Sequence, residues 1–316
     1  MLEGWLDFEK PIADVGEEIE ELRAIGGFAD QIARLQAQAD KLKHRIYANL
    51  TPWQRVQLAR HPRRPYALDF IERMVQDWVE VHGDRSFGDD SAIVAGYGRI
   101  DDRRFAIIGT HRGRDTREKL TRNFGMPHPE GYRKALRVMQ TAGRFNMPIL
   151  TLVDVMGAYP GRGAEERGQA EAIARNLREM SVLPVPLIAV ITGEGGSGGA
   201  LALAVGNRVL AMENAMYSVI SPEGCASILW RDGSRAEEAA ATLKITSTDL
   251  LRFGIIDEVI PEPLGGAHSD WDAATQLVKT TVLRCLAELA PLNADQLITQ
   301  RIEKFRGMGF ISTATA

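Results

Sequence analysis

Residues 193–200 constrain the fold of this chain most strongly, because five of these eight residues are glycine and lack a Cβ atom. Backbone amides in such a stretch can contact a ligand directly. The apolar, β-branched run 187–191 before it predicts a buried strand, and residues 201–205 after it predict a short helix. A strand, a glycine loop and a helix in this order predict an anion site, because the first amides of a helix have no partner within the helix.

The same stretch also matches a dinucleotide-binding fingerprint. Gly193, Gly195 and Gly198 have the required spacing, and Glu213 lies where a ribose-binding acid could stand. The match is weak, however, because the predicted helix has room for only about two turns before Asn207, whereas a dinucleotide unit has a full-length crossover helix. The sequence therefore favours an anion site of another kind.

Composition narrows the class of protein. With 316 residues, 45% of them hydrophobic, the chain can bury a large core and forms one large domain or a domain with an appendage. A net charge of -4 argues against a general nucleic-acid binder. Cys225 and Cys285 form neither a disulfide framework nor a metal pair, which is typical of a reducing compartment. Without a signal segment or an apolar run near the roughly 18 residues that span a bilayer, we expect a cytoplasmic chain.

The N-terminal region is predicted to be helical. Apolar residues at three- and four-residue steps indicate an amphipathic helix over residues 32–50, and Gly26 and Gly27 separate it from an earlier acidic helix. We expect this helical arm to lie on its own domain, with a coiled-coil dimer contact as the alternative. Further helices are predicted from Pro52 and over residues 68–79. We therefore divide the chain into a helical extension, 1–85, and an α/β domain, 86–316.

A second glycine loop follows a second predicted strand. Residues 93–100 and 105–108 predict a hairpin, and strand 148–153 then leads into the glycine loop 154–163 and a helix over 164–178. Two adjacent parallel strands would bring their glycine loops to one edge of a sheet, which predicts a binding groove made of backbone. Later elements are strand 217–221, a helix from Pro222, strand 254–260, helix 273–289 and a loose tail after Gly307.

Several side chains could carry chemistry, but each has a structural interpretation. Residues 111–122 hold five Lys or Arg, which form either a solvated loop or a contact with an anionic partner such as a nucleotide-bearing coenzyme. Cys225 is expected to be a buried thiol rather than a nucleophile, because no His stands at an obvious partnering position nearby. His111 and His268 are expected to be structural.

Long blocks of the chain resemble the alpha subunit of the bacterial acetyl-CoA carboxylase carboxyltransferase. The resemblance extends from about Asp7 to His268 and implies an α/β, crotonase-like (ClpP/crotonase) spiral of ββα units after an N-terminal helical extension. In this fold, glycine-bearing helix N-termini form oxyanion holes. The blocks that carry it are 123–127, 129–137, 157–161, 163–169, 172–180, 193–200, 218–230 and 261–268.

The resemblance also implies a reaction and partners. A carboxyl group would move from carboxybiotin on the biotin carboxyl carrier protein to acetyl-CoA, giving malonyl-CoA in the first committed step of fatty acid biosynthesis. A zinc-ribbon beta subunit would complete an α2β2 complex that works with biotin carboxylase, and zinc is expected only in that partner. No covalently bound cofactor is expected. The alternative function is a non-catalytic scaffold subunit that binds acyl-CoA or a dinucleotide.

The resemblance assigns roles to the backbone of both glycine loops. The family pattern before Gly157 is Asp-Thr-Pro, whereas this chain has Asp154, Val155 and Met156, so side-chain contacts of that loop differ. The departing biotin nitrogen can accept the methyl proton of acetyl-CoA, so no side-chain base is expected. The expected catalytic positions are Gly198 and Gly199, whose amides form the oxyanion hole, together with Gly195 and Gly196. The expected substrate-binding positions are Gly157, Ala158, Tyr159 and Ala200. No metal ligand is expected.

Overall fold

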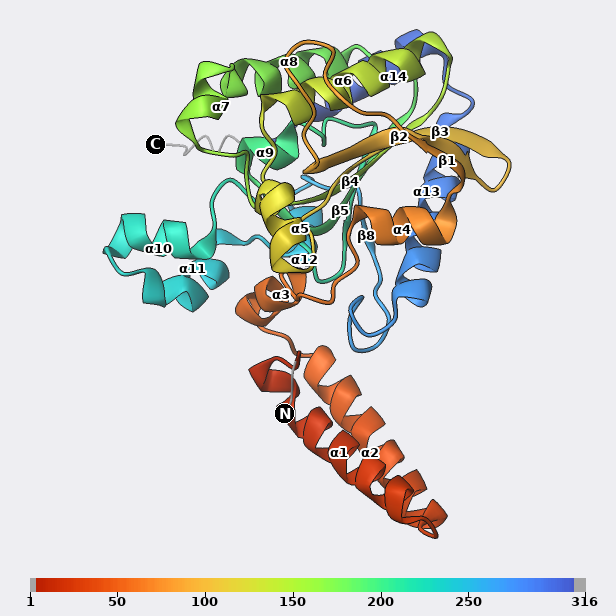
Figure 1. The fold of residues 1–316 in the computed structure, drawn as a ribbon, viewed down its shortest axis with the longest axis vertical. Coiled ribbons are helices and arrows are strands. Elements are labelled where there is room, and N and C mark those ends of the chain that lie inside the picture. The colour runs from red at the N-terminus through yellow and green to blue at the C-terminus, as the bar shows by residue number, and fades with distance from the viewer. Residues whose placement is uncertain (1–3, 310–316) are drawn as a thin grey trace, which may run out of the picture.

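A sheet of eight strands forms the centre of the computed structural model, which describes residues 4–309 (Figure 1). Its order is β1-β2-β3-β4-β5-β6-β8, and β7 also pairs with β5. The pairings β1–β2 and β2–β3 are antiparallel, and the others are parallel. The strands are β1 (Gln76–Glu80), β2 (Ile93–Ile100), β3 (Arg103–Thr110), β4 (Ile149–Val155), β5 (Leu187–Gly196), β6 (Arg208–Met212), β7 (Met216–Ser218) and β8 (Glu258–Ile260).

Helices cover both faces of this sheet. Figure 1 shows α6 (Pro129–Arg144), α8 (Gln169–Ser181) and α14 (Ala294–Arg306) on one side, and α4 (Ala67–Met74) and α13 (Trp271–Leu289) on the other. Every residue of β4 and β5 is buried, because helices cover both faces of these central strands. The remaining α-helices are α3 (Pro52–Ala59), α5 (Thr116–Thr121), α7 (Arg162–Glu166), α9 (Ser197–Leu201), α10 (Pro222–Trp230), α11 (Ala236–Leu243) and α12 (Ser247–Arg252).

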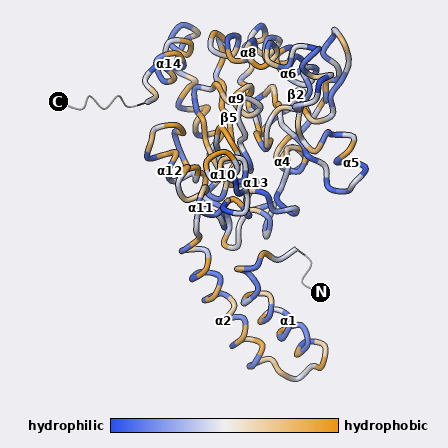
Figure 2. The backbone as a smooth tube through the Cα atoms, turned by 90° about the vertical axis from the view of Figure 1, so that its left-hand side faces the viewer, coloured by the Kyte–Doolittle hydropathy of each residue, from blue (hydrophilic) through white to orange (hydrophobic). Residues whose placement is uncertain are grey.

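The N-terminal arm is a helical hairpin that projects from the body, as Figures 1 and 2 both show. Its two helices, α1 (Lys10–Ile25) and α2 (Ala29–Tyr47), contact each other, and α2 has no buried residue. The expectation that the amphipathic helix lies on its own domain is therefore wrong. Gly26 and Gly27 have φ of 80° and 88°, which lets the chain reverse and return along α1.

Two predicted helices differ from the structure. The helix predicted over residues 68–79 ends at Met74, and the chain continues as edge strand β1, which crosses glycines of β2 so closely that a Cβ on Gly96 would lie 2.2 Å from the carbonyl oxygen of Val79. The helix predicted over 164–178 is two helices, α7 and α8, because Gly168 has a left-handed backbone with φ of 84°. Tertiary pairing and one glycine conformation override the local pattern here.

The other main predictions agree with the structure. The hairpin, the strands before both glycine loops, the helix after Pro222 and the closing helix are all present, and the late strand is limited to β8. The division at residues 85 and 86 stays a prediction. Within its first part, β1 belongs to the sheet and α4 contacts it, whereas α1 and α2 form the projecting hairpin. The predicted loose tail falls mostly on residues 310–316, outside the described range. Among the described helices, none is long and apolar enough to cross a membrane.

Candidate functional site

The two predicted glycine loops meet at the edge of the sheet where β4 and β5 end. A Cβ on Gly196 would lie 2.0 Å from the carbonyl oxygen of Met156, and a Cβ on Gly199 would lie 2.6 Å from the amide nitrogen of Ala158. Real side chains cannot approach backbone atoms so closely, so only glycine lets these segments touch. The structure therefore brings the loops together backbone against backbone, as the sequence predicts.

The secondary structure within the first glycine stretch differs from the prediction. Strand β5 runs through Gly196, α9 begins at Ser197, and the helix predicted over 201–205 is a turn beyond the end of α9. The buried amide of Asn176 donates to the carbonyl oxygen of Ala202 (3.2 Å). This contact satisfies a carbonyl at the end of α9 that no further helical turn serves. A helix of five residues is too short for the dinucleotide interpretation.

Backbone donors are available in both segments. Within residues 4–309, the amides of Gly157 and Ala158 donate to no backbone or side-chain acceptor. Gly198 and Gly199 lie in the first turn of α9, where amides have no partner inside the helix. These four positions therefore offer hydrogen-bond donors on two touching segments.

The remaining predicted glycine and alanine positions shape the edge in other ways. Gly195 and Gly196 belong to β5 and pair with Tyr217 and Ser218 of β7, so they form strand rather than loop. Ala200 is fully buried, and its methyl group packs in the core. These three positions support the groove instead of presenting side chains to it.

Tyr159 is fixed by its surroundings. Its ring stacks on His128 with centroids 4.2 Å apart, and its amide donates to the carbonyl oxygen of Pro127 (3.0 Å). The side-chain amide of Gln169 donates to the carbonyl oxygen of Tyr159 (3.0 Å). A Cβ on Gly161 would lie 2.3 Å from the tyrosine ring, which explains the glycine there. A substrate contact by Tyr159 stays a prediction.

An apolar cavity of about 330 Å³ opens beside Gly198. Val219 lies at its lining with 81% of its surface exposed. Burial raises the pKa of Tyr217, which also lines the cavity, to about 12, so its phenol stays neutral. The lining residues are Ser197, Gly198, Leu201, Ala204, Val209, Tyr217, Ser218, Val219, Leu250, Ile255, Phe305 and Met308.

Charged side chains lie directly behind the two glycine segments, and no role was predicted for the two acidic ones, Asp154 and Glu194. Arg112 bridges Asp154 (2.7 Å) and Glu194 (3.1 Å), and both carboxylates are almost fully buried. Burial raises the pKa of Asp154. Burial would also raise the pKa of Glu194, but Arg112 and Arg60 outweigh it and lower this pKa. The signal in the sequence was one acidic residue near the end of each of two buried strands.

The basic segment 111–122 serves mainly internal contacts. Arg112 bridges the two buried carboxylates, Arg114 pairs with Asp69, and Arg122 pairs with Glu118. These three arginines are therefore not part of a freely solvated loop, and the predicted contact of this segment with an anionic partner stays a prediction.

The histidines and cysteines have structural surroundings. Burial lowers the pKa of His111 to about 4. His268 faces Glu9 (3.4 Å) and stacks on His61 with centroids 3.9 Å apart. The ligand atoms of Glu9, His61 and His268 lie close enough to share a cation, but both ring nitrogens of His61 already have partners. Its Nδ1 accepts a hydrogen bond from the amide of Arg63 (3.1 Å), and its Nε2 lies 2.7 Å from the carbonyl oxygen of Gly4. Cys225 and Cys285 are buried free thiols.

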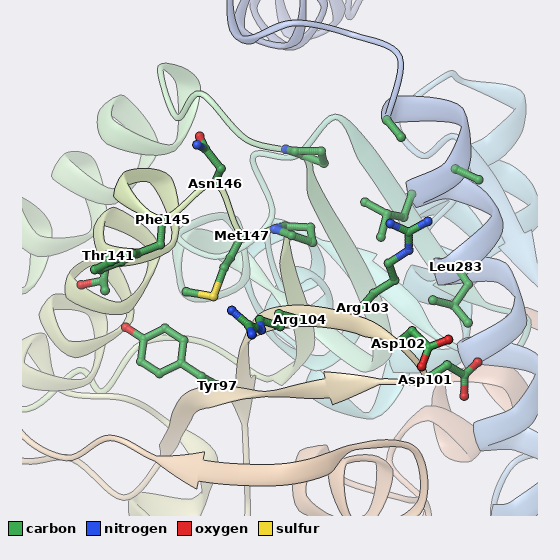
Figure 3. A pocket seen from close by; sticks show the side chains of 15 residues that line it. Tyr97, Asp101, Asp102, Arg103, Arg104, Thr141, Phe145, Asn146, Met147 and Leu283 are labelled. Carbon is green, nitrogen blue, oxygen red and sulfur yellow. The ribbon is translucent and has the colours of Figure 1, made fainter.

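A larger cavity of about 940 Å³ lies at the opposite edge of the sheet. It is lined where strands begin, by Arg103 and Arg104 of β3, by Pro148 before β4 and by Pro186 before β5. Figure 3 shows Tyr97, Arg104 and Met147 around this space. None of the predicted site residues lines it. Because ligands of parallel sheets bind beyond the carboxyl ends of strands, the smaller cavity beside Gly198 is the better candidate.

Several solved structures share this fold. Transcarboxylase 12S superposes with a TM-score of 0.59 and 22% identity over 72% of this chain, although the match covers only 42% of that chain. A Pseudomonas malonate decarboxylase, solved as a hetero-tetramer with coenzyme A, gives a TM-score of 0.56 and 19% identity over 68% of this chain and 86% of its own. These likenesses confirm the expected crotonase-like α/β fold.

Sequence comparisons match almost the whole chain, at higher identity than the structural comparisons. Residues 5–309 match the family described as "Acetyl co-enzyme A carboxylase carboxyltransferase-like". The acetyl-coenzyme A carboxylase carboxyl transferase subunit alpha of Syntrophotalea carbinolica is 58% identical over 97% of this chain and 98% of its own length. The protein of the same name from Anoxybacillus flavithermus is 55% identical over 96% and 95%. The chain belongs to the family of acetyl-CoA carboxylase carboxyltransferase alpha subunits, which are biotin-dependent transferases.

Proposed function

We propose that this chain forms one side of a carboxyltransferase site that moves the carboxyl group of carboxybiotin, carried on the biotin carboxyl carrier protein, to acetyl-CoA. The product is malonyl-CoA. The observation that carries the proposal is the meeting of free amides at Gly157 and Ala158 with the first-turn amides of Gly198 and Gly199. The names of relatives 55–58% identical over nearly the whole chain support the same reaction.

The chemistry needs donors more than it needs side-chain bases. Negative charge develops on the ureido oxygen of biotin as the carboxyl group leaves, and on the thioester oxygen of acetyl-CoA as its methyl proton is removed. Backbone amides that are already in place stabilise such charge without reorganisation, and one lost donor costs about 10²- to 10³-fold in rate. The biotin nitrogen that loses the carboxyl group accepts the methyl proton of acetyl-CoA. The proton transfer therefore needs no side chain of this protein as a base.

The apolar cavity beside Gly198 suits the biotin side of the reaction. Its walls are mostly aliphatic and aromatic, and its volume of about 330 Å³ lies at the lower end for small-ligand sites. A compact ring system in this cavity would place its polar edge toward Ser197 and Gly198, which are the lining residues of the glycine segment. Apolar walls also exclude water, which strengthens each amide contact.

A partner subunit is expected to cover the groove. An alpha subunit implies another subunit, and apolar side chains are exposed beside the glycine segments at Met156 and Val219 and on α10 at Ile228 and Leu229. Exposed apolar residues near a site mark partner surfaces. We propose that a zinc-ribbon beta subunit covers this surface in an α2β2 complex and supplies most of the coenzyme A site. Biotin carboxylase would recharge the carrier.

The scaffold alternative lacks a supporting observation of this kind. A dinucleotide unit needs a long helix after the glycine stretch, and α9 has five residues. A non-catalytic acyl-CoA scaffold would not require backbone donors from two segments to meet.

The test is to assay the chain alone and together with its beta subunit. Malonyl-CoA formation from acetyl-CoA and carboxybiotin should require both chains, because one subunit offers only one side of the cleft. Full activity of the isolated chain would contradict the shared site. An assembled pair that makes no malonyl-CoA would favour the scaffold function.

A further inference from the structure

A buried ionic cluster connects the two strands that carry the glycine segments. We call Arg112, Asp154 and Glu194 the clamp. Nη2 of Arg112 lies 2.7 Å from Oδ1 of Asp154 and 3.1 Å from Oε2 of Glu194. The two carboxylate side chains are each 2% exposed, and that of Arg112 is 14% exposed. Two carboxylates buried this deeply at the ends of neighbouring strands repel each other unless a cation lies between them, and Arg112 occupies that position.

The clamp lies at an irregularity in the sheet. Val153 pairs with Ile191, but the next pair is Val155 with Gly195, so β5 has two more residues than β4 in this interval. Oδ1 of Asp154 accepts a hydrogen bond from the amide of Glu194 (2.8 Å) inside this bulge. A bulge of this kind bends its strand and changes the direction of the following residues.

The bulge also explains the first glycine of the stretch. A Cβ on Gly193 would lie 2.6 Å from Oδ1 of Asp154, so a larger residue would push the carboxylate away. Gly193 therefore leaves the space that the Asp154 carboxylate occupies, at the point where β5 turns toward the loop after β4. Beyond this point, Gly196 touches Met156 and Gly199 touches Ala158.

We propose that Arg112 is a positioning residue that sets the distance between the two glycine segments. By holding Asp154 and Glu194 together, it keeps the amides of Gly157 and Ala158 beside those of Gly198 and Gly199. The effect of Arg112 on catalysis rests on the proposed function, since Arg112 influences the reaction only if those amides bind the reacting oxygens. Its effect on the geometry of the two segments is independent of the proposed function.

A second arginine extends the clamp toward the surface. Arg60, just after α3, donates to Glu194 (2.8 Å) and to Glu223 of α10 (2.7 Å). It contacts one member of the clamp and takes no part in the bridge between β4 and β5. Its removal should therefore affect the glycine segments less than removal of Arg112.

The decisive variant is Arg112→Lys in the assembled alpha and beta pair. Lysine keeps the positive charge, but its side chain is shorter and does not reach the position from which Nη2 of Arg112 contacts both carboxylates. Turnover (kcat) should fall at least tenfold with KM for acetyl-CoA within about twofold, because orientation and not binding is disturbed. Hydrogen exchange should become faster in peptides covering residues 154–160 and 193–200.

Arg114→Lys is the matched control, because Arg114 comes from the same segment, pairs with Asp69 and lies over the Tyr66 ring. It should leave kcat and exchange at the glycine segments unchanged. If Arg112→Lys does not fold, Glu194→Gln tests the same bridge with one carboxylate neutralised and its volume kept. The same loss of turnover and faster exchange are then expected.

The outcomes separate the two levels of the proposal. A folded Arg112→Lys or Glu194→Gln variant with wild-type kcat and wild-type exchange in both peptides would overturn the clamp. Faster exchange with unchanged kcat would support the clamp as a geometric device and would instead contradict the catalytic role of the amides.

Discussion

The two edges of the parallel sheet differ in what they offer a ligand. The edge where β3, β4 and β5 begin has the larger cavity, about 940 Å³, bordered by exposed side chains such as Phe145. The edge where β4 and β5 end has only about 330 Å³, but there free amides, close glycine contacts and a buried ionic cluster coincide. Convergent donors on a rigid support therefore make this edge the better candidate for the site, although its cavity is smaller.

The largest effect is expected from Glu262, whose partner Arg64 also donates to the carbonyl oxygen of Thr192 in β5 (2.6 Å). Its buried carboxylate pairs with Arg64 at 2.5 Å and accepts from the amide of Asn214 at 2.9 Å. The variant Glu262→Gln leaves the Arg64 charge unpaired, so the free energy of unfolding at pH 7 should fall by about 3–5 kcal/mol. Urea unfolding measures this change. Asp272→Asn is the control, because its pair with Arg73 is exposed and should contribute less than about 1 kcal/mol.

The same carboxylate predicts a pH dependence. Burial would raise the pKa of Glu262, but Arg64 and the hydrogen bonds from Arg64 and Asn214 outweigh it and lower the pKa from 4.5 to about 2. A depressed pKa in the folded state stabilises the fold above the unfolded value, and this contribution is lost as the pH falls from about 4.5 toward 2. Unfolding of Glu262→Gln should depend less on pH in this window than unfolding of the wild type. If the free energy of unfolding changed equally with pH in the variant and in the wild type, a group other than Glu262 would cause the pH dependence.

The next largest effect is expected from Gly157→Pro. Proline removes the amide, whereas Gly157→Ala keeps it and adds a Cβ that would meet no atom within 4 Å. Turnover of the proline variant should fall by about 10²-fold, equivalent to about 2.7 kcal/mol, while the alanine variant stays near the wild type. Steady-state kinetics of the assembled pair measures both. Normal turnover of a folded Gly157→Pro pair would leave the oxyanion role to Gly198 and Gly199.

A smaller effect is expected from restoring the family residues before Gly157. Met156 is half exposed beside the groove, so Met156→Pro should change KM for carrier-borne biotin by a few-fold, as is usual for a peripheral contact. Val155 is fully buried, so Val155→Thr should instead lower the free energy of unfolding by about 1–3 kcal/mol. Kinetics and thermal unfolding of the two single variants separate these effects. A large change in turnover with unchanged KM would contradict this role of Met156.

The smallest effect is expected at the opposite edge. Phe145→Ala and Arg104→Ala change the walls of the 940 Å³ cavity without contact to either glycine segment. Turnover of the assembled pair should stay within about twofold, and surface positions of this kind change the free energy of unfolding by about 0.5 kcal/mol or less. A tenfold loss of turnover in either variant would place the active site at the edge with the larger cavity instead.

The sequence alone determined the two strand and glycine units and their meeting point. Runs of β-branched residues that precede Gly157 and Gly195 predicted buried parallel strands, and such strands place their ends at one edge. The resemblance of the motif blocks also gave the family correctly. These features are local in the chain, because periodicity and glycine content act over a few residues.

Only the tertiary structure decided the end of α4, the start of α9 and the clamp. The local pattern allows the helix to continue past residue 75, but pairing of β1 with β2 ends it at Met74. Strand β5 continues through Gly196, and α9 begins at Ser197, whose backbone is left-handed with φ of 52°. Arg112 is 42 positions from Asp154 and 82 from Glu194 along the chain. No short pattern relates residues so far apart, because their ion pairs exist only after the strands have aligned and burial has excluded water.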